Sequence, residues 1–203
     1  VFLTKSGGDY SLLVYPPGID YIVAFFACVY AGVTAVPALP PANARTLPRL
    51  RLIAQDAGAR VALTLRAIKD SVASMHEAGS ETDDPLQTCH WLASDEPGEA
   101  TNDDANNDTS NDANKTANAM AHAARWQAPV TSADDIVFLQ YTSGSTGAPK
   151  GVMVSNHNLL ANLRLSQTTY GMQQGQVMVS WLPPHHDFGL IGAIISPVWL
   201  GCH

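Results

Sequence analysis

Short apolar runs alternate with longer helical patterns over the first third of the chain. The apolar runs predict buried strands over Tyr10–Tyr15, Val33–Val36 and Val61–Leu65. Proline is expected to end the first two strands, because Pro16 and Pro37 follow them directly and cannot donate a hydrogen bond to a strand ladder.

Two helices are predicted between these strands. Asp20 can cap the first, whose apolar residues lie on nearly all faces until Gly32 ends it, so it should be a core helix. The second should be amphipathic and half exposed up to Gly58. Its apolar residues recur at spacings of three and four: Leu47, Leu50, Ile53 and Ala54. This order of strands and helices predicts an α/β fold, mainly a parallel sheet covered by helices on both faces.

The pattern stops near Glu77, where the composition changes. Between Glu77 and Asp112 there are 11 of the 18 acidic residues and no Lys or Arg, so the remainder carries 11 basic and 7 acidic residues. That positive excess is too scattered for a nucleic-acid-binding stripe, and no nucleic acid is expected as a partner. Thr101–Asn118 holds six Asn and four Asp and no apolar residue larger than Ala. It is predicted to be disordered, with a calcium-binding loop as the weaker alternative.

The cysteines and the hydropathy of the chain indicate where the protein is located. Three distant cysteines, without a CxxC spacing, favour a reducing, cytoplasmic location over a disulfide framework or a zinc site. The apolar segment Tyr21–Val36 is only 16 residues long, so burial is expected and no membrane span. The chain opens at Val1 without Met and closes on an apolar stretch, which suggests part of a longer protein.

The most informative residues follow a predicted strand over Ile136–Tyr141. The chain continues there as TSGSTGAPK, before a second strand over Val152–Val154. Glycines let successive backbone N–H groups converge, hydroxyls add donors and a lysine adds a mobile positive charge, which together suit a polyphosphate. A solvated Gly/Ser turn is the alternative. The predicted phosphate-binding residues are Thr142, Ser143, Gly144, Ser145, Thr146, Gly147 and Lys150.

Two other nucleotide motifs do not fit. A Walker A loop ends in Gly-Lys-Ser/Thr and enters a helix, whereas Pro149 precedes Lys150 here and a strand follows. The DFG sequence at Asp187 is typical of kinases, but no HRD catalytic loop or GxGxxG lid accompanies it.

The stretch YTSGSTGAPKGVMVS resembles the signature phosphate loop of adenylate-forming (AMP-binding) enzymes, which include acyl-CoA synthetases, nonribosomal peptide adenylation domains, firefly luciferase and fatty acyl-AMP ligases. Similarity to the fatty acyl-AMP ligase branch is greatest in YPPGIDYIVAFFACVYAGVTAVPALPP, RLIAQDAGARVALT and SWLPPHHDFGLIGAIISPVWLG. The resemblance covers nearly the whole chain apart from the insert. It implies the N-terminal portion of the large domain, an incomplete fold divided into 1–93, an insert over 94–125, and a continuation over 126–203.

By this resemblance, the loop would hold the β- and γ-phosphates of Mg-ATP while a fatty carboxylate attacks the α-phosphorus, giving acyl-AMP and pyrophosphate. Lys150 and His186 are the implied catalytic residues, with His186 at the mouth of an acyl tunnel. ATP and Mg²⁺ are the implied cofactors, and no protein-bound metal site is expected. The acyl group would pass to the phosphopantetheine of an acyl carrier protein. A fatty acyl-CoA synthetase and an inactive or binding-only fragment are the alternatives.

Neighbouring residues carry further expectations. A backbone-satisfied core histidine is the other interpretation of His186, and Asp187 either orients it or caps the following GLIGAII helix. Trp181, Phe188 and Trp199 are expected in the core or the tunnel wall.

Some features depart from the family pattern. His185 replaces a usual aromatic residue, and Asn156 replaces a usual His and is expected to cap the helix that follows. The family's adenine and ribose motifs, its hinge and its C-terminal domain would lie beyond His203. The isolated chain is therefore expected to bind phosphates weakly and to be inactive.

Overall fold

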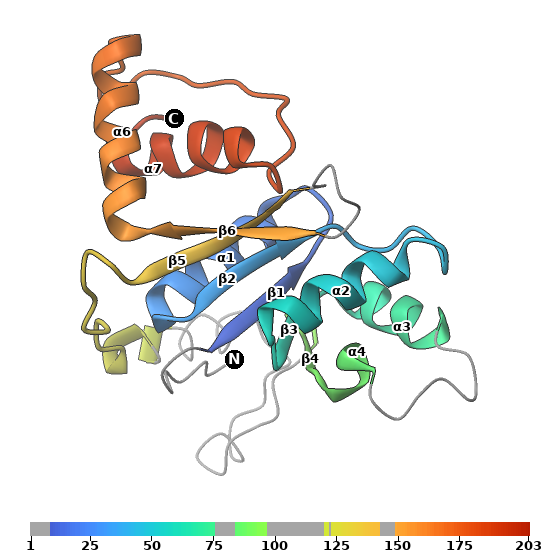
Figure 1. Ribbon diagram of the computed structural model, residues 1–203. Coiled ribbons are helices and arrows are strands. Elements are labelled where there is room, and N and C mark those ends of the chain that lie inside the picture. The colour runs from blue at the N-terminus through green and yellow to red at the C-terminus, as the bar shows by residue number, and fades with distance from the viewer. Residues whose placement is uncertain (1–8, 76–83, 97–119, 122, 143–148) are drawn as a thin grey trace.

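A single six-stranded sheet organises the computed structural model, which describes residues 9–75, 84–96, 120–121, 123–142 and 149–203 (Figure 1). Its strands are β1 (Tyr10–Val14), β2 (Thr34–Ala38), β3 (Val61–Thr64), β4 (His90–Ala93), β5 (Ile136–Thr142) and β6 (Lys150–Ser155). Their order across the sheet is β4-β3-β1-β2-β5-β6. Every neighbouring pair is parallel except β5 and β6. The predicted α/β class with a mainly parallel sheet is confirmed.

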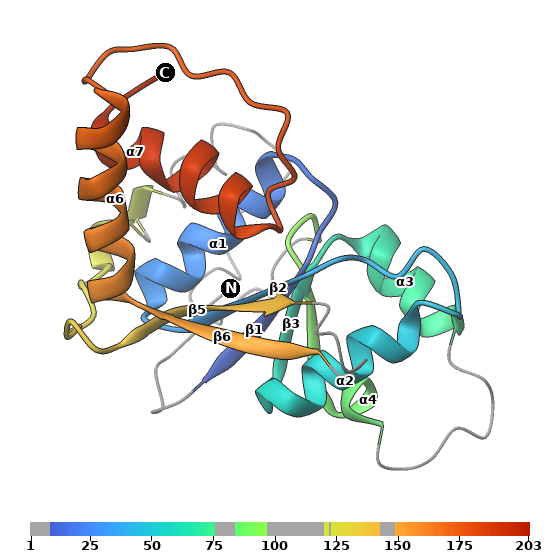
Figure 2. The same ribbon diagram turned by 45° about the horizontal axis from the view of Figure 1, so that its top comes forward.

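Helices cover both faces of the sheet, as the tilted view in Figure 2 shows. One face carries α1 (Ile19–Ala31), α6 (Asn156–Tyr170) and the π-helix η1 (Phe188–Ile195), which continues into α7 (Ser196–Leu200). The other carries α2 (Leu47–Ala57), α3 (Arg66–Met75) and α4 (Pro85–Thr88). Two apolar cores result, one on each side of the strands.

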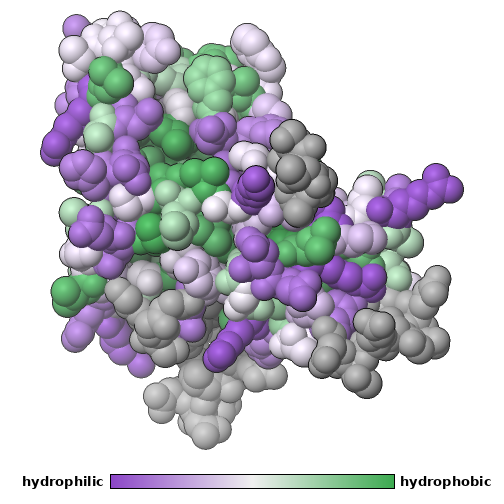
Figure 3. Space-filling view, in the orientation of Figure 1, coloured by the Kyte–Doolittle hydropathy of each residue, from purple (hydrophilic) through white to green (hydrophobic). Residues whose placement is uncertain are grey.

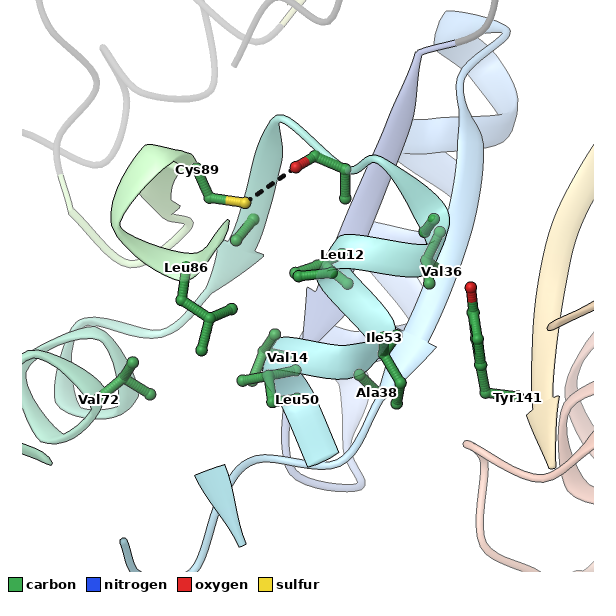
Figure 4. Close-up of a cluster of buried hydrophobic side chains, with 14 of the residues drawn as sticks. Leu12, Val14, Val36, Ala38, Leu50, Ile53, Val72, Leu86, Cys89 and Tyr141 are labelled. Atoms are coloured by element: carbon green, nitrogen blue, oxygen red, sulfur yellow. Dashed lines mark hydrogen bonds between the residues drawn. The ribbon is translucent and has the colours of Figure 1, made fainter. Parts of the chain in front are cut away.

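The predicted amphipathic helix is α2. Leu47, Leu50, Ile53 and Ala54 are all buried, and Leu50 and Ile53 point toward β1 and β2 in Figure 4. The helix ends at Gly58 in the left-handed conformation, as the pattern indicated.

The expectation of a core helix holds for only one side of α1. Tyr21, Phe25 and Cys28 are buried, but Ile19 is 68 % and Val23 60 % exposed, so the helix buries only one side. Asp20 lies inside the first turn and is not the cap, because Gly18 occupies that position. None of the helices that the structure describes is long and apolar enough to cross a membrane.

Proline does not end β2. The strand continues through Pro37 to Ala38, opposite Leu13 and Val14 of β1. The pairing of β2 with β5 is at Ala35, two residues before Pro37. The strand therefore tolerates a residue without a backbone N–H at position 37. The first strand, in contrast, ends at Val14, one residue earlier than predicted.

Three elements lie where the sequence pattern gave no prediction: α3, α4 and β4. Of these, β4 extends the sheet by pairing with β3. The α6 helix was predicted, but its cap was assigned to the wrong residue. Ser155 is the N-cap and forms a capping box with Asn158, while Asn156 donates instead to the carbonyl of Ser132. The Asn/Asp-rich segment 101–118, predicted to be disordered, lies outside the described residues.

Candidate functional site at the end of β5

Thr142 and Lys150 face each other across the last pair of the β5–β6 ladder. The predicted phosphate loop joins them. Five of its predicted binding residues lie outside the described residues: Ser143, Gly144, Ser145, Thr146 and Gly147. Directly opposed residues of an antiparallel pair share one face of the sheet, with Cβ atoms about 4.5–5.5 Å apart. The side chains of Thr142 and Lys150 therefore leave the same face, and both residues are exposed.

Alternation along β5 determines which face this is. Phe138 packs with α1, α6 and η1, whereas Leu139 and Tyr141 pack on the α2 side. Successive side chains of a strand point to opposite faces, so Gln140 and Thr142 share the α1, α6 and η1 side with Phe138.

Gln140 connects this face to the segment that carries His186. Its side-chain Nε2 donates to the carbonyl of His185 at 3.0 Å. The segment folds back on itself, because His186 N donates to Pro183 O at 3.2 Å and Leu190 N donates to His186 O at 2.7 Å. The structure thus brings His186 to the side of the sheet from which Thr142 and Lys150 project.

His185 and His186 are neighbours in space as well as in sequence, with ring centroids 4.9 Å apart. Burial lowers the pKa of His185, and the charge of a protonated His186 lowers it further. His185 is half-buried and His186 is exposed, which contradicts the alternative interpretation of His186 as a core histidine. Its imidazole is accessible for chemistry.

Asp187 acts as a cap. Its carboxylate Oδ1 accepts from the backbone N–H of Phe188 at 2.8 Å, at the start of η1. This is the second of the two roles predicted for it. Within the described ranges, no three His, Cys, Asp or Glu side chains gather as a metal site.

Gly189 sets how closely η1 approaches the preceding segment. A Cβ there would overlap the Pro183 carbonyl oxygen and lie 2.7 Å from the carbonyl carbon. Only glycine permits this contact, which keeps the residues from Pro183 to His186 against the helix.

The aromatic residues around this segment do not lie in the core of the chain as described. Trp181 is 90 %, Phe188 66 % and Trp199 39 % exposed. Apolar surface is visible around the C-terminal helices and β6 in Figure 3. No tunnel wall is assigned to these side chains by the structure.

On the opposite face of the sheet, a side-chain hydrogen bond joins the end of β5 to α2. Tyr141 Oη donates to Asp56 Oδ2 of α2 at 2.6 Å, and its ring lies against Gly151, its partner across the β5–β6 ladder. Burial raises the pKa of Tyr141, and hydrogen bonding to Asp56 raises it further, so the phenol remains a donor. Tyr141 also packs near Ile53 and Ala38 (Figure 4).

Sequence reasoning missed Gln140 and Gly189. Gln140 is the one polar residue before Thr142 in the strand IVFLQYT, and a buried amide requires a partner, so that signal was present. For Gly189 no comparable signal exists, since the close approach to Pro183 depends on tertiary packing.

The arrangement combines a hydroxyl, a mobile ammonium group and an accessible imidazole at one end of a sheet. Residues 5–203 match the family of AMP-binding enzymes. The chain belongs to the AMP-binding enzyme family. The structure is also similar to the fatty acyl-adenylate ligase of Legionella pneumophila, solved in complex with acyl adenylate and pyrophosphate. That match has a TM-score of 0.73 and 33 % identity over 98 % of this chain and 30 % of the other.

Curated relatives of this AMP-binding chain include fatty-acid ligases with different named acceptors. The medium-chain-fatty-acid–[acyl-carrier-protein] ligase JamA of Moorena producens is 35 % identical over 94 % of this chain. The putative fatty-acid–CoA ligase fadD25 of Mycobacterium tuberculosis is 32 % identical over 97 % of it. The chain spans about 30 % of the length of these relatives (29 % and 31 %). Its fold is that of the N-terminal part of adenylate-forming enzymes.

Proposed function

We propose that this chain supplies the phosphate-binding part of an enzyme that activates a fatty acid with ATP, giving acyl-AMP and pyrophosphate. One observation carries the proposal: Thr142 and Lys150 flank the predicted loop on the face to which Gln140 ties the His186 segment. In the proposed reaction, the loop binds the phosphates while His186 lies near the carboxylate, so the two have to lie on the same side of the sheet. The family membership and the fatty-acid ligases among the relatives support the same chemistry.

The proposed roles follow from charge and donor chemistry. Hydroxyl and backbone N–H groups of the loop would hold the β- and γ-phosphates, together with the Lys150 ammonium. The residues are Thr142, Ser143, Gly144, Ser145, Thr146, Gly147 and Lys150. A carboxylate oxygen of the fatty acid attacks the α-phosphorus, and the bond from that phosphorus to pyrophosphate breaks. Because the substrate is itself the nucleophile, positioning and charge neutralisation are what the protein must supply.

Lys150 and His186 are proposed as the catalytic residues. The mobile ammonium group of Lys150 neutralises charge as pyrophosphate departs, and His186 lies beside the reacting carboxylate. Thr142 and the predicted loop provide oxygen and N–H groups that suit a magnesium-bound triphosphate. Bound Mg²⁺ would neutralise part of the phosphate charge.

The proposed acceptor is the phosphopantetheine thiol of an acyl carrier protein, and the proposed compartment is the cytoplasm, where ATP is supplied. JamA, a ligase for acyl carrier protein, favours this acceptor. Coenzyme A is the second candidate, since fadD25 is named as a fatty-acid–CoA ligase. The isolated chain is proposed to be inactive, because it spans only about 30 % of such enzymes.

Exchange of labelled pyrophosphate into ATP tests the proposal in the complete gene product. The wild-type protein should exchange only when fatty acid is present, and K150A should lower the rate by about 100- to 1000-fold, the range for losing one donor to developing charge. K69A is the matched control, because Lys69 pairs with Glu96 on the far side of the sheet. Wild-type exchange without any fatty-acid dependence, or equal rates in K150A and K69A, would refute the proposal.

A further inference from the structure

Gln140 is an uncommon residue for a buried strand. It is 7 % exposed, and its two neighbours on β5, Leu139 and Tyr141, are buried as well. Its amide orientation is determined by chemistry, because the carbonyl of His185 can only accept and must face Nε2. The other amide atom, Oε1, is buried, and no group in the described part of the chain donates to it.

An amide that is half satisfied is a poor choice for stability alone. Leaving a buried acceptor without a partner costs free energy, whereas an apolar side chain of the same shape would avoid that cost. What the amide achieves at this position is a link between segments that are 45 residues apart in sequence. One end is β5, two residues before Thr142, and the other is the turn that presents His186.

We propose that Gln140 is a positioning residue, which fixes the segment from Pro183 to Asp187 relative to Thr142 and Lys150. The inference rests on the proposed function and adds a residue to it. Gln140 does not contact the reacting atoms in this account. It acts through the His185 carbonyl. The backbone hydrogen bonds from His186 N to Pro183 O and from Leu190 N to His186 O transmit the restraint to η1.

Two substitutions separate positioning from packing. Q140L keeps the size of the side chain but removes the donor, so unfolding midpoints should remain near those of the wild type. The kcat/KM for the fatty acid should fall on the order of 10- to 100-fold, because displacements of about 1 Å at a reacting centre have effects of that size. The fall should be nearly independent of pH.

Q140E adds a pH signature. A buried Glu beside the His185 carbonyl has a raised pKa, and only its protonated form can donate to that carbonyl. The kcat/KM of Q140E should therefore rise toward the wild-type value as the pH is lowered and fall as the pH is raised. Neither the wild type nor Q140L has this titration.

T34V is the matched control. Thr34 Oγ1 donates to the carbonyl of Ile136 at 3.0 Å, which is the same kind of bond at the opposite end of β5. T34V should keep the kcat/KM of the wild type.

The variants are compared in the complete gene product by fatty-acid-dependent pyrophosphate release. A fall in Q140L with acid recovery in Q140E and an unaffected T34V supports the inference. Full activity in Q140L, or an equal fall in T34V, overturns it.

Inactive wild-type protein would refute the proposed function. The positioning role of Gln140 would then be tested by backbone hydrogen exchange. The amides of His186 and Leu190, which donate within the segment, should then exchange several-fold faster in Q140L than in T34V. Equal exchange in the two variants would overturn the inference.

Discussion

Replacing Gly189 by alanine displaces the segment that carries His186. The new Cβ would lie 2.7 Å from the Pro183 carbonyl carbon, whereas non-bonded carbons pack at about 3.5–4.0 Å, so one of them must move by at least about 0.8 Å. The Gln140–His185 hydrogen bond is 3.0 Å long, so a displacement of that size along it would exceed the range of a hydrogen bond. Overpacking of this kind costs about 1–3 kcal/mol in the free energy of unfolding.

G192A provides the control within the same helix. A Cβ on Gly192 would lie 3.4 Å from the Phe188 ring, which is ordinary contact. There the change from glycine should be neutral or stabilising by up to about 1 kcal/mol. Urea unfolding measures both stabilities, and fatty-acid-dependent pyrophosphate release measures activity. We expect G189A to lose stability and on the order of 100-fold in rate, and G192A to lose neither. A G189A protein as stable and active as G192A would refute the close packing of η1 on Pro183.

Three further predictions concern stability and cysteine reactivity. Y141F should lower the free energy of unfolding by about 1–2 kcal/mol. A double-mutant cycle with D56A should give a coupling energy of about 1 kcal/mol, and a coupling energy of zero would contradict the hydrogen bond to Asp56. Burial raises the pKa of the Cys89 thiol from 9.0 to about 11, so its contribution to the free energy of unfolding is complete below about pH 9 and is lost above it by about 1.4 kcal/mol per pH unit. In urea unfolding at alkaline pH, the free energy of unfolding of C89A should therefore fall less steeply with pH than that of the wild type. An unchanged slope would contradict this. Iodoacetamide at pH 8 should label Cys202 before Cys28, whose pKa burial raises to about 12, and faster labelling of Cys28 would contradict its burial.

Local patterns predicted the elements whose environment is simple. The spacing of Leu47, Leu50 and Ile53 identifies α2 because one face of that helix meets one core. The same reasoning failed for α1, where Ile19 and Val23 are apolar but exposed, since apolar character alone does not show what covers a side chain. The prediction that Pro37 ends β2 was wrong because the effect of a proline depends on which neighbouring strand needs the missing N–H.

The candidate site was predicted in part. The residues flanking the loop, Thr142 and Lys150, could be identified because glycine, hydroxyl and lysine chemistry is visible in a contiguous stretch. The approach of the His186 segment could not, because the hydrogen bond from Gln140 to the His185 carbonyl joins residues 45 apart in sequence. Asp56 is a further example: on the sequence it belongs to the exposed side of α2, and only the folded chain brings Tyr141 to it.

Mass spectrometry of the reaction products tests the central claim most directly. The complete gene product is incubated with Mg-ATP and a panel of fatty acids, with and without acyl carrier protein or coenzyme A. The account predicts a fatty acyl-AMP in the wild-type reaction that is greatly reduced in K150A and is consumed when the carrier protein is added. Absence of any acyl adenylate or acyl-thioester product across the panel, from protein that is folded and binds ATP, would contradict it.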